Sequence, residues 1–463
     1  MVADVPGGVI IAAPASGTGK TTIATGLVAA LARRMSVAPF KVGPDYIDPG
    51  YHALAAGHPG RNLDSVMCGT GLVGPLYAHG AAGHDLGVVE GVMGLFDGRI
   101  GGDPLDAAAS TAEIARILGM PVILVVDARH MSQSAAALVH GFATMDDRVH
   151  VAGAIVNRVG SDRHEAVVRD AIEAVGVPVL GAIPRVDGIE VPSRHLGLVT
   201  AAEGGAAART AVAMMADLVE EHVDVDAVVE LAGVRQGFAP WDPGKALGVE
   251  GEAPPQDGPH IALAGGPAFT FAYAEHAELL AAAGARVEVF DPLVDDLPDA
   301  GGLVVPGGFP EEHAADLAAR DDLAAAVRAM IADGAAVHAE CAGLLWLLES
   351  LDGHRMCGVI PGSASMGRLS LGYRTATMLS PSALGDVGGR VVGHEFHRTR
   401  LDDGAEARAR AAGWTPAWGW HGWDGAAVSE GFVSPDGRVH ASYLHVHPAG
   451  APEMMRRFVG SCG

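Results

Sequence analysis

A Gly-rich turn near the N-terminus predicts a phosphate-binding loop, although it departs from the usual pattern. Residues 10–27 read IIAAPASGTGKTTIATGL, with Pro14 where the strict Gly-x-x-x-x-Gly-Lys-Ser/Thr pattern has its first Gly. The small residues before the helix still let several backbone N–H groups point at one anion, and the helix adds its positive end. Lys20 would supply a charge for the outer phosphates, and Thr21 a hydroxyl for magnesium. The expected nucleotide-binding residues are Ser16, Gly17, Thr18, Gly19, Lys20, Thr21 and Thr22.

Acidic residues after two apolar segments are candidate ligands of a divalent cation. Asp45 and Asp48 lie in FKVGPDYIDPGYH (40–52), and Glu90 and Asp97 lie in VVEGVMGLFDG (88–98). Carboxylates together with water and phosphate suit magnesium. The alternatives are ordinary turn chemistry for an Asp beside Pro or Gly, and a solvated carboxylate at a strand end. Asn157, after another apolar run, is expected either to contact the base or to cap a helix.

A candidate nucleophile lies in the second half of the chain. VHAECAGLLWLL (337–348) places Cys341 between an apolar strand and an apolar helix, where a tight turn exposes a side chain and lowers a thiol pKa. The alternative is a small buried hydrophobic residue. Gly307 and Gly308 follow another strand in LVVPGGFPEE (303–312), and their N–H groups could form an oxyanion hole.

Two histidines near the C-terminus are candidates for the base that activates the thiol. His445 and His447 in ASYLHVHPAG (441–450) are two residues apart, which places both on one face of a predicted strand. Either could act as general base for Cys341. A His-x-His metal pair is the alternative, although no clustered third ligand accompanies it.

The elements that must position these residues read as two α/β series. Short apolar runs at 7–13, 86–92, 121–128 and 151–159 alternate with helical stretches, which predicts a doubly wound parallel sheet. A second α/β series starts near residue 260, after a stretch rich in Pro, Gly and acid. We therefore predict a P-loop domain at 1–244, a linker at 245–259 and a second α/β domain at 260–463. The strands of residues 375–460 are not clear from the sequence.

Composition limits the partners and the cellular location. The 31 basic and 55 acidic residues give a net charge of −24, which argues against nucleic acid and anionic membranes as partners. Four cysteines without a CxxC pair favour neither a disulfide framework nor a zinc site and fit a reducing cytosol. Neither a signal peptide nor a membrane-spanning run is recognisable, so a cytoplasmic location is expected.

Taken together, the motifs resemble those of the cobyrinic or hydrogenobyrinic acid a,c-diamide synthases, which are ATP- and glutamine-dependent amidotransferases of vitamin B12 biosynthesis. The resemblance covers nearly the whole chain. Its N-terminal part is similar to dethiobiotin synthetase and its C-terminal part to class I glutamine amidotransferases. The segments that carry it are APASGTGKTTIATGL, PFKVGPDYIDPGYHALAAGHPGRNLD, VEGVMGLFDG, RHLGLV, FTFAYAEHAELLAAAGA, PGGFPE, AECAGLLWL, LGYR, GHEFHRT and ASYLHVH.

The resemblance implies roles for these residues. Lys20 and Thr21 would bind ATP and magnesium; Cys341 would be the nucleophile, with His445 as its activating base. In the synthetase site, Asp45 and Glu90 would bind magnesium, Asp97 would be catalytic, and Tyr46 and Asp48 would contact substrate. Many class I amidotransferases carry His-Pro-Glu, whereas here Pro448 and Ala449 follow His447, so the third member of the triad is unidentified.

The implied substrates are ATP, glutamine and a corrin, with Mg²⁺ as cofactor. Cobyric acid synthase and the enzyme that amidates nickel-sirohydrochlorin are alternatives from the same class. A partitioning ATPase is a further alternative, which Ala15 opposes because it stands where that class has a second Lys. The motifs do not separate corrins with and without cobalt, although the Ala-rich composition favours hydrogenobyrinic acid. Lys41, Arg99 and Arg194 are expected to offset the acidic surface near a carboxylate-rich substrate. The sequence is silent on oligomeric state, and a homodimer is the working hypothesis.

Overall fold

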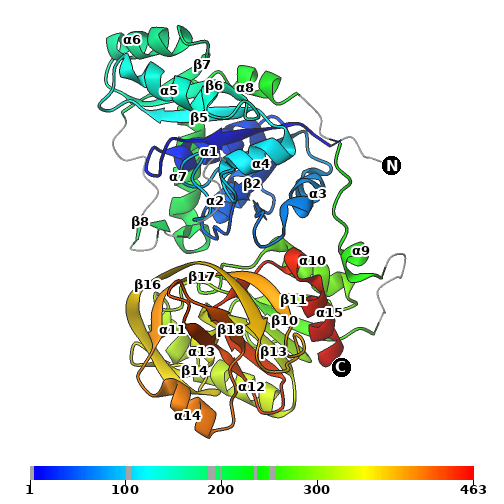
Figure 1. The fold of residues 1–463 in the computed structure, drawn as a ribbon. Coiled ribbons are helices and arrows are strands. Elements are labelled where there is room, and N and C mark those ends of the chain that lie inside the picture. Colours follow the sequence, from blue (N-terminus) through cyan, green and yellow to red (C-terminus); the bar gives the residue numbers. More distant parts are fainter. Residues whose placement is uncertain are drawn as a thin grey trace. The chain divides into compact units, whose positions relative to one another are not determined.

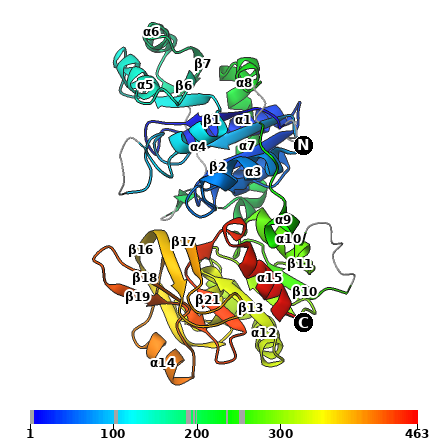
Figure 2. The ribbon, with the colours of Figure 1, turned by 45° about the vertical axis from the view of Figure 1, so that its right-hand side comes forward.

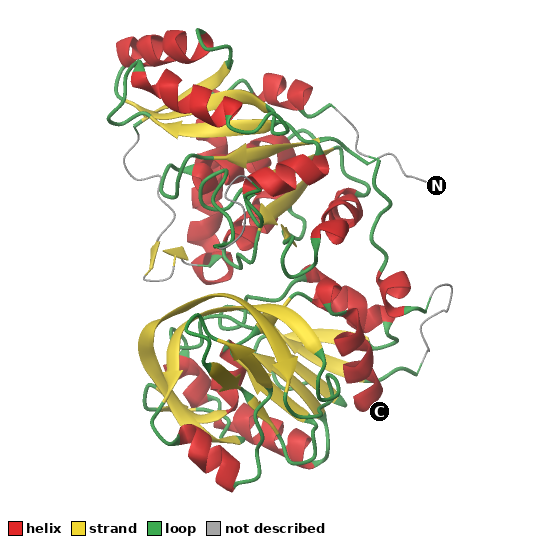
Figure 3. Cartoon of the chain, viewed as in Figure 1, coloured by secondary structure: helices red, strands yellow, loops and turns green. Residues whose placement is uncertain are grey.

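The computed structural model describes residues 5–100, 106–185, 193–194, 197–198, 200–233, 237–249 and 257–463. Its contacts divide the chain into two compact units, Met1–Trp241 and Asp242–Gly463 (Figure 1). Each unit has its own sheets and helices, as the colouring by secondary structure in Figure 3 shows. The two units are described separately below.

The first unit is built on a parallel sheet of seven described strands in the order β3-β2-β4-β1-β5-β6-β7. Most of its strand residues are buried, as expected when helices cover both faces of a parallel sheet. This confirms the predicted doubly wound fold. The strands are β1 Gly8–Ala12, β2 Val37–Val42, β3 Arg61–Leu63, β4 Leu86–Glu90, β5 Val122–Asp127, β6 Val151–Val159 and β7 Val179–Pro184.

The helices of the first unit pack in separate groups. Helices α1, α2 and α7 contact one another, α3 contacts α4, and α5 contacts α6. The order of the strands changes direction around β1, so the loops that follow β1 and β4 lie side by side at the carboxyl edge, where α/β sheets bind ligands. The helices are α1 Lys20–Ala32, α2 Asp48–Ala56, α3 Thr70–Ala81, α4 Thr111–Leu118, α5 Ser134–Thr144, α6 Asp162–Glu173, α7 Ala201–His222 and α8 Val225–Leu231; β8 Ser193–Arg194 pairs with β9 Gly197–Leu198.

The second unit contains a mostly parallel sheet in the order β11-β10-β12-β13-β21-β20, with β20 antiparallel. The four predicted strands of this half appear as β10 His260–Ala264, β11 Arg286–Phe290, β12 Gly302–Val305 and β13 Ala336–Glu340. Strand β21, Val439–Ser442, comes from the C-terminal part of the chain and pairs with β13. The sheet is completed by β20, Phe432–Val433.

The tail whose strands were unclear from the sequence forms much of a second sheet. The long strands β16, Ile360–Met378, and β17, Arg390–Leu401, pair antiparallel and curve around the unit (Figure 2). Strand β22, His445–Val446, pairs with β17 and therefore lies at one end of this sheet. The other strands are β14 Leu348–Leu351, β15 His354–Arg355, β18 Trp418–His421 and β19 Ala427–Glu430.

The helices of the second unit include one inside the segment predicted as a linker. Residues 245–247 form the end of α9, Pro243–Leu247, which contacts α10 and α15. The side chain of Asp242 begins this helix by accepting a hydrogen bond from Lys245 N at 2.7 Å. Residues 250–256 lie outside the described residues. The remaining helices are α10 Ala274–Ala282, α11 Ala314–Ala319, α12 Asp321–Ala332, α13 Ala342–Leu347, α14 Ala405–Ala411, η1 Pro448–Gly450 and α15 Pro452–Ser461.

Among the residues that the structure describes, every helix is too short or too polar to cross a membrane.

Candidate active sites

The Gly-rich loop of the first unit joins β1 to α1 in a conformation that depends on two glycines. Gly17 and Gly19 have φ angles of 80° and 93°, in the left-handed region that side chains disfavour. Gly19 immediately precedes Lys20, the first residue of α1. The loop therefore ends at a helix N-terminus, whose N–H groups can bind an anion.

Two side chains near the end of β6 hold this loop in place. Asn157 Nδ2 donates to the backbone oxygen of Thr18 at 2.8 Å, and Arg158 Nη1 donates to Gly17 O at 2.9 Å. Arg158 also contacts Asp127 Oδ2 at 2.7 Å. A Cβ atom on Gly19 would lie 2.3 Å from Asn157 Nδ2. The structure thus brings Asn157 to the predicted loop, where its amide contacts backbone.

The segment after β4 packs against the same loop. Lys20 Nζ donates to Met93 O at 2.8 Å, and Leu95 N donates to Ala13 O at 2.8 Å. A Cβ atom on Gly94 would lie 2.6 Å from Pro14 O, so a larger residue there would displace the loop. Lys20 is buried, and this burial, together with the charge of Lys41, lowers its pKa to about 8.

A buried polar cluster surrounds the start of α1. Thr21 Oγ1 donates to Glu90 Oε1 at 2.6 Å and to Asp48 Oδ2 at 3.3 Å. Lys41 Nζ lies 2.6 Å from Asp48 Oδ2 and 3.0 Å from Glu90 Oε1. His52 Nε2 lies 2.8 Å from Glu90 Oε2. The structure therefore brings together three predicted residues, Thr21, Asp48 and Glu90.

The charges in this cluster change the proton affinities of its carboxyl groups in opposite directions. Burial opposes ionisation of Glu90, but Lys41 and His52 offset it, so the pKa of Glu90 falls well below its usual range. Burial and the nearby Asp45 raise the pKa of Asp48 to about 6, although Lys41 opposes the shift. Burial would lower the pKa of Lys41, but Asp48 and Glu90 outweigh it and raise that pKa.

Other residues predicted in the first site have different surroundings. Asp45 Oδ1 accepts hydrogen bonds from Ile47 N at 2.9 Å and Asp48 N at 3.0 Å, and so caps the turn before α2. Asp97 is exposed, and its carboxylate accepts from Gly94 N at 2.9 Å. Further predicted residues are the buried Tyr46, the exposed Ser16 and the half-buried Thr22. The side chain of Arg194 lies outside the described residues.

The oxygen atoms of this cluster are suitable ligands for the magnesium ion that the sequence predicts. Thr21, Asp48 and Glu90 offer hydroxyl and carboxylate oxygens next to the Gly-rich loop. Within the described ranges there is no group of three or more His, Cys, Asp or Glu side chains placed to hold a metal. Magnesium commonly uses one or two carboxylates and completes its shell with water and substrate phosphates, which this set allows.

In the second unit, Cys341 lies at a strained turn between β13 and α13. Its φ and ψ are 47° and −96°, which is rare for a residue with a side chain. The backbone N of Cys341 donates to Ser442 O at 2.7 Å, which ties the turn to the end of β21. A Cβ atom on Gly343 would lie 2.3 Å from Val305 O, so the helix approaches β12 more closely than another residue would allow.

The predicted lowering of the pKa of Cys341 is wrong for the protein without substrate. The Cys341 side chain is 2% exposed, and burial together with Glu311 raises its pKa well above the usual value. The N–H of Ala342 opposes this only in part. The thiol lies 3.8 Å from Phe396 O. The raised pKa is consistent with a Cys341 thiol that is neutral before substrate binds and loses its proton as it attacks the substrate.

His445 is fully buried next to the predicted oxyanion loop. A Cβ atom on Gly307 would lie 2.2 Å from His445 Cε1, so the ring packs directly on that glycine. Phe271 N donates to Gly307 O at 3.0 Å, and Gly308 closely approaches Ala268 O. The structure thus brings His445 together with Gly307, as expected for parts of one site.

The sequence places His445 and His447 on one strand, but in the structure only His445 belongs to it. Strand β22 ends at Val446, and His447 caps the start of η1, where its Nδ1 accepts from Ala449 N at 3.3 Å. The His447 ring packs on Tyr273, with ring centroids 4.2 Å apart, and its Nε2 lies 3.9 Å from Glu275 Oε2. The two histidines therefore have different neighbours.

Sequence reasoning missed Glu340, the residue immediately before Cys341. Its Oε1 accepts from Val446 N at 3.2 Å and lies 3.3 Å from His338 Nε2. Its Oε2 lies 3.8 Å from His445 Nδ1. The available signal was an acidic residue at the end of an apolar strand, as for Glu90. His52 was also missed, because His is not among the usual magnesium ligands.

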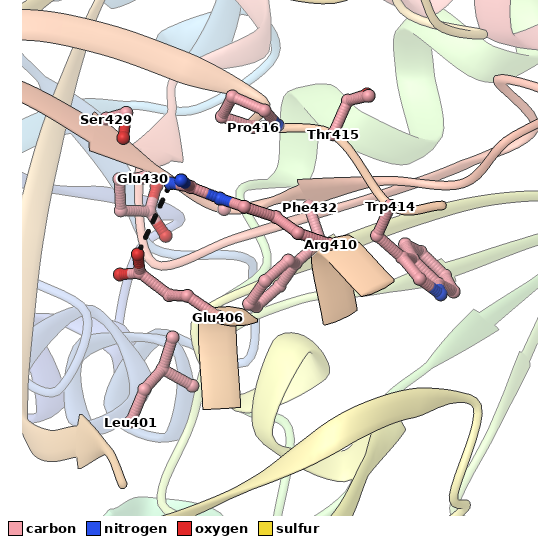
Figure 4. Close-up of a pocket in the computed structure, with 10 residues that line it drawn as sticks. Leu401, Glu406, Arg410, Trp414, Thr415, Pro416, Ser429, Glu430 and Phe432 are labelled. Atoms are coloured by element: carbon pink, nitrogen blue, oxygen red, sulfur yellow. Dashed lines mark ion pairs between the residues drawn. The ribbon is translucent and has the colours of Figure 1, made fainter. Parts of the chain in front are cut away.

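A separate pocket of the second unit is lined by Glu430 and by an ion pair between Arg410 and Glu406 (Figure 4). Burial raises the pKa of Glu430 to about 7, although its carboxylate accepts from Ser442 Oγ at 2.6 Å. The residues predicted for catalysis are not among those that line it.

Comparison with known proteins agrees with this division of chemistry. The CobQ/CobB/MinD/ParA nucleotide binding domain family matches residues 9–199, and the CobB/CobQ-like glutamine amidotransferase domain family matches residues 260–452. Curated relatives include a hydrogenobyrinate a,c-diamide synthase of Mycobacterium tuberculosis, 56% identical over 97% of both chains. One of Streptomyces coelicolor is 52% identical over 98% of this chain and 97% of the relative. A cobyrinate a,c-diamide synthase of Gloeobacter violaceus is 41% identical over 98% of this chain and 96% of the relative. The chain therefore belongs to the family of hydrogenobyrinate and cobyrinate a,c-diamide synthases.

Proposed function

We propose that this protein uses ATP and glutamine to convert the a and c acetate carboxylates of a corrin into amides. The observation that carries the proposal is the likeness, over 97% of both chains, to hydrogenobyrinate a,c-diamide synthases. The content of the two units supports the proposal, because the first unit has the Gly-rich loop and the second has the strained cysteine.

In the second unit, Cys341 would attack the side-chain amide of glutamine. Sulfur bonds to the amide carbon, and the thiol proton passes through His445 to the departing nitrogen, which leaves as ammonia. Water then cleaves the thioester to give glutamate. The N–H groups near Gly307 and Gly308 would stabilise the oxyanion that forms on the way.

In the first unit, a corrin carboxylate would attack the terminal phosphate of ATP and displace ADP. The resulting acyl phosphate has a good leaving group, and ammonia displaces inorganic phosphate to form the amide. Lys20 and the N-terminus of α1 would stabilise the charge that moves between phosphates. Lys41 would hold the two carboxylates of the buried cluster in place, since it contacts both Asp48 and Glu90.

Magnesium would be held by Thr21 and Glu90, with Asp48 as a further ligand. When bound, it would offset negative charge on the outer phosphates. Asp45 would have to leave the turn that it caps to serve as the predicted ligand. Asp97, Tyr46 and an Asn157 contact to the base stay predictions for this site.

The cobalt-free corrin is the proposed substrate. Five relatives named hydrogenobyrinate a,c-diamide synthase are 47–56% identical, whereas three named cobyrinate a,c-diamide synthase are 37–41% identical. A homodimer and a cytoplasmic location complete the proposal. The four cysteines, all of them free, fit a reducing compartment.

Mass spectrometry of the products tests this function. The protein is incubated separately with hydrogenobyrinic and cobyrinic acid, together with ATP, magnesium and glutamine. We expect two successive amidations, faster with hydrogenobyrinic acid, and none without ATP. If neither corrin is amidated while ATP is hydrolysed without them, the proposal is refuted. Faster amidation of cobyrinic acid would overturn only the choice of corrin.

A further inference from the structure

We infer that Glu340 is the positioning residue that holds His445 in the orientation needed to move the proton of Cys341. The inference rests on the proposed glutaminase activity. Many class I amidotransferases carry His-Pro-Glu, in which the Glu orients the catalytic His. In this chain the corresponding position is Ala449, and Glu340 would take over that role.

The contacts of Glu340 reach both the backbone and the ring of the β22 segment. One carboxylate oxygen accepts from Val446 N at 3.2 Å, which fixes the main chain next to the histidine. The other oxygen lies 3.8 Å from His445 Nδ1. This separation is longer than a hydrogen bond, but catalytic hydrogen bonds are often long before substrate binds and shorten in the complex.

The direction of this contact matters for the chemistry. A carboxylate beside Nδ1 favours the tautomer with its proton on that atom, which leaves Nε2 to accept a proton from a nucleophile. The carboxylate also stabilises the imidazolium that forms after the transfer. Glu340 is 3% exposed and His445 is fully buried, so water contributes little to holding this ring.

The charge state of Glu340 suits the role. Burial opposes its ionisation, but contacts with His338 and His445 more than compensate and hold its pKa well below the usual range. His338 lies on the same face of β13, two residues earlier, with Nε2 3.3 Å from Glu340 Oε1. One oxygen of Glu340 therefore contacts His338 and Val446 N, while the other faces His445.

Other buried or half-buried carboxylates of the second unit have different partners. Glu430 accepts from Ser442 Oγ at 2.6 Å and Tyr443 N at 2.7 Å. Glu395 pairs with Arg374 at 2.7 Å. Glu275 lies 3.9 Å from His447. Glu340, by contrast, has its Oε2 3.8 Å from His445 Nδ1.

Further titratable groups surround the pair and would shape its pH dependence. His338 on β13 and His276 on α10 both lower the pKa of Glu340. His394 on β17 is the register partner of His445 and interacts with it electrostatically. The charges of Glu311 and Glu430 raise the pKa of the Cys341 thiol. A test must therefore compare variants at one position across the whole pH range.

The test uses Glu340→Gln, which keeps the shape but removes the charge, and Glu340→Asp, which keeps the charge. The matched control is Glu275→Gln, the same change at a buried carboxylate near His447. Each full-length variant is assayed for glutamine hydrolysis from pH 5 to pH 10, for ammonia-dependent amidation and for thermal unfolding. The ammonia assay reports whether the first unit remains active.

We expect Glu340→Gln to lower kcat for glutamine hydrolysis by roughly two to four orders of magnitude with little change in KM. The acid limb of its kcat/KM profile should move to lower pH, because a lost negative charge makes protonation of the neighbouring imidazole harder. Glu340→Asp should keep the wild-type limb and recover part of the rate. Glu275→Gln should keep both rate and profile, and ammonia-dependent amidation should persist in all three.

The inference is overturned if Glu340→Gln keeps its rate within a few-fold, or loses rate with an unmoved acid limb. It is also overturned if Glu275→Gln behaves in the same way as Glu340→Gln. If Glu340→Gln does not fold, Glu340→Asp decides: partial glutaminase activity with the wild-type acid limb supports the inference, whereas a shifted limb or a folded but inactive variant overturns it. A wild-type protein that hydrolyses no glutamine would refute the proposed function, and this role with it.

Discussion

Alanine substitutions at Gly17 and Gly19 should weaken ATP binding to very different extents. Both glycines have left-handed backbone angles, so both substitutions strain the loop. They differ in their surroundings: a Cβ atom on Gly17 has no neighbour within 4 Å, whereas one on Gly19 lies 2.3 Å from Asn157 Nδ2. The pair therefore separates backbone strain from steric overlap.

The expected magnitudes follow from these two contributions. A left-handed conformation costs an L-residue about 1–2 kcal/mol. In Gly19→Ala the amide of Asn157 must also move away and lose its 2.8 Å hydrogen bond to Thr18 O, which adds about 1–3 kcal/mol for a buried polar group. At 1.4 kcal/mol per tenfold change, ATP affinity should fall about 5- to 30-fold in Gly17→Ala. It should fall about 30-fold to several-thousand-fold in Gly19→Ala.

Isothermal titration calorimetry with ATP and magnesium measures both affinities. Adding Asn157→Ala to Gly19→Ala removes the overlap, so this double variant should bind ATP more tightly than the sum of the single effects predicts. Equal losses in Gly17→Ala and Gly19→Ala, or strict additivity in the double variant, would refute the contact between the Asn157 amide and the loop.

Four further predictions concern the two sites. Cys341→Ser should abolish glutamine-dependent amidation but keep amidation with free ammonia; equal loss in both assays would show that the two activities are not separable. Glu90→Gln should lower ATP-dependent amidation by orders of magnitude, because it removes a charge from the magnesium site, and should leave glutamine hydrolysis at least partly intact; near-normal amidation would exclude this role. His445→Ala should lose roughly two or more orders of magnitude in glutaminase rate and His447→Ala much less, and the opposite ranking would assign the base to His447. Iodoacetamide at pH 7 should label the half-buried Cys68 before the buried Cys341, whose thiol pKa is raised, as peptide mass spectrometry would reveal; faster labelling of Cys341 would contradict that shift.

The sheets at the centre of both units could be predicted because their strands are buried. Runs such as those at 121–128 and 151–159 are almost continuously apolar, as parallel strands covered by helices must be. Strand β16 could not be recognised in this way, since many of its residues are partly exposed and its burial does not alternate regularly. Its partner β17 is set by long-range pairing, which leaves little local signal in the sequence.

The candidate sites were predictable where function constrains the local sequence. The Gly-rich loop and Cys341 follow apolar strands and Glu90 ends one, and these positions indicate them when they are read together with the neighbouring motifs. The contact of Lys41 with Glu90 and that of Glu340 with His445 could not be predicted, because each joins segments that are distant in the sequence. The thiol pKa was predicted with the wrong sign, since burial outweighs the stabilisation expected at a helix start.

The connection between Cys341 and the C-terminal strands has a consequence for protein synthesis. Cys341 N is bound to Ser442 O, and Glu340 is bound to Val446 N, 106 residues further along the chain. When the ribosome has just completed β13, the segment that supplies these two partners has not yet been made. The hydrogen bonds that hold the strained turn can therefore form only after almost the whole polypeptide has been synthesised. Chains that terminate before Ser442 lack both hydrogen bonds, so we expect them to lack the glutaminase activity proposed for Cys341.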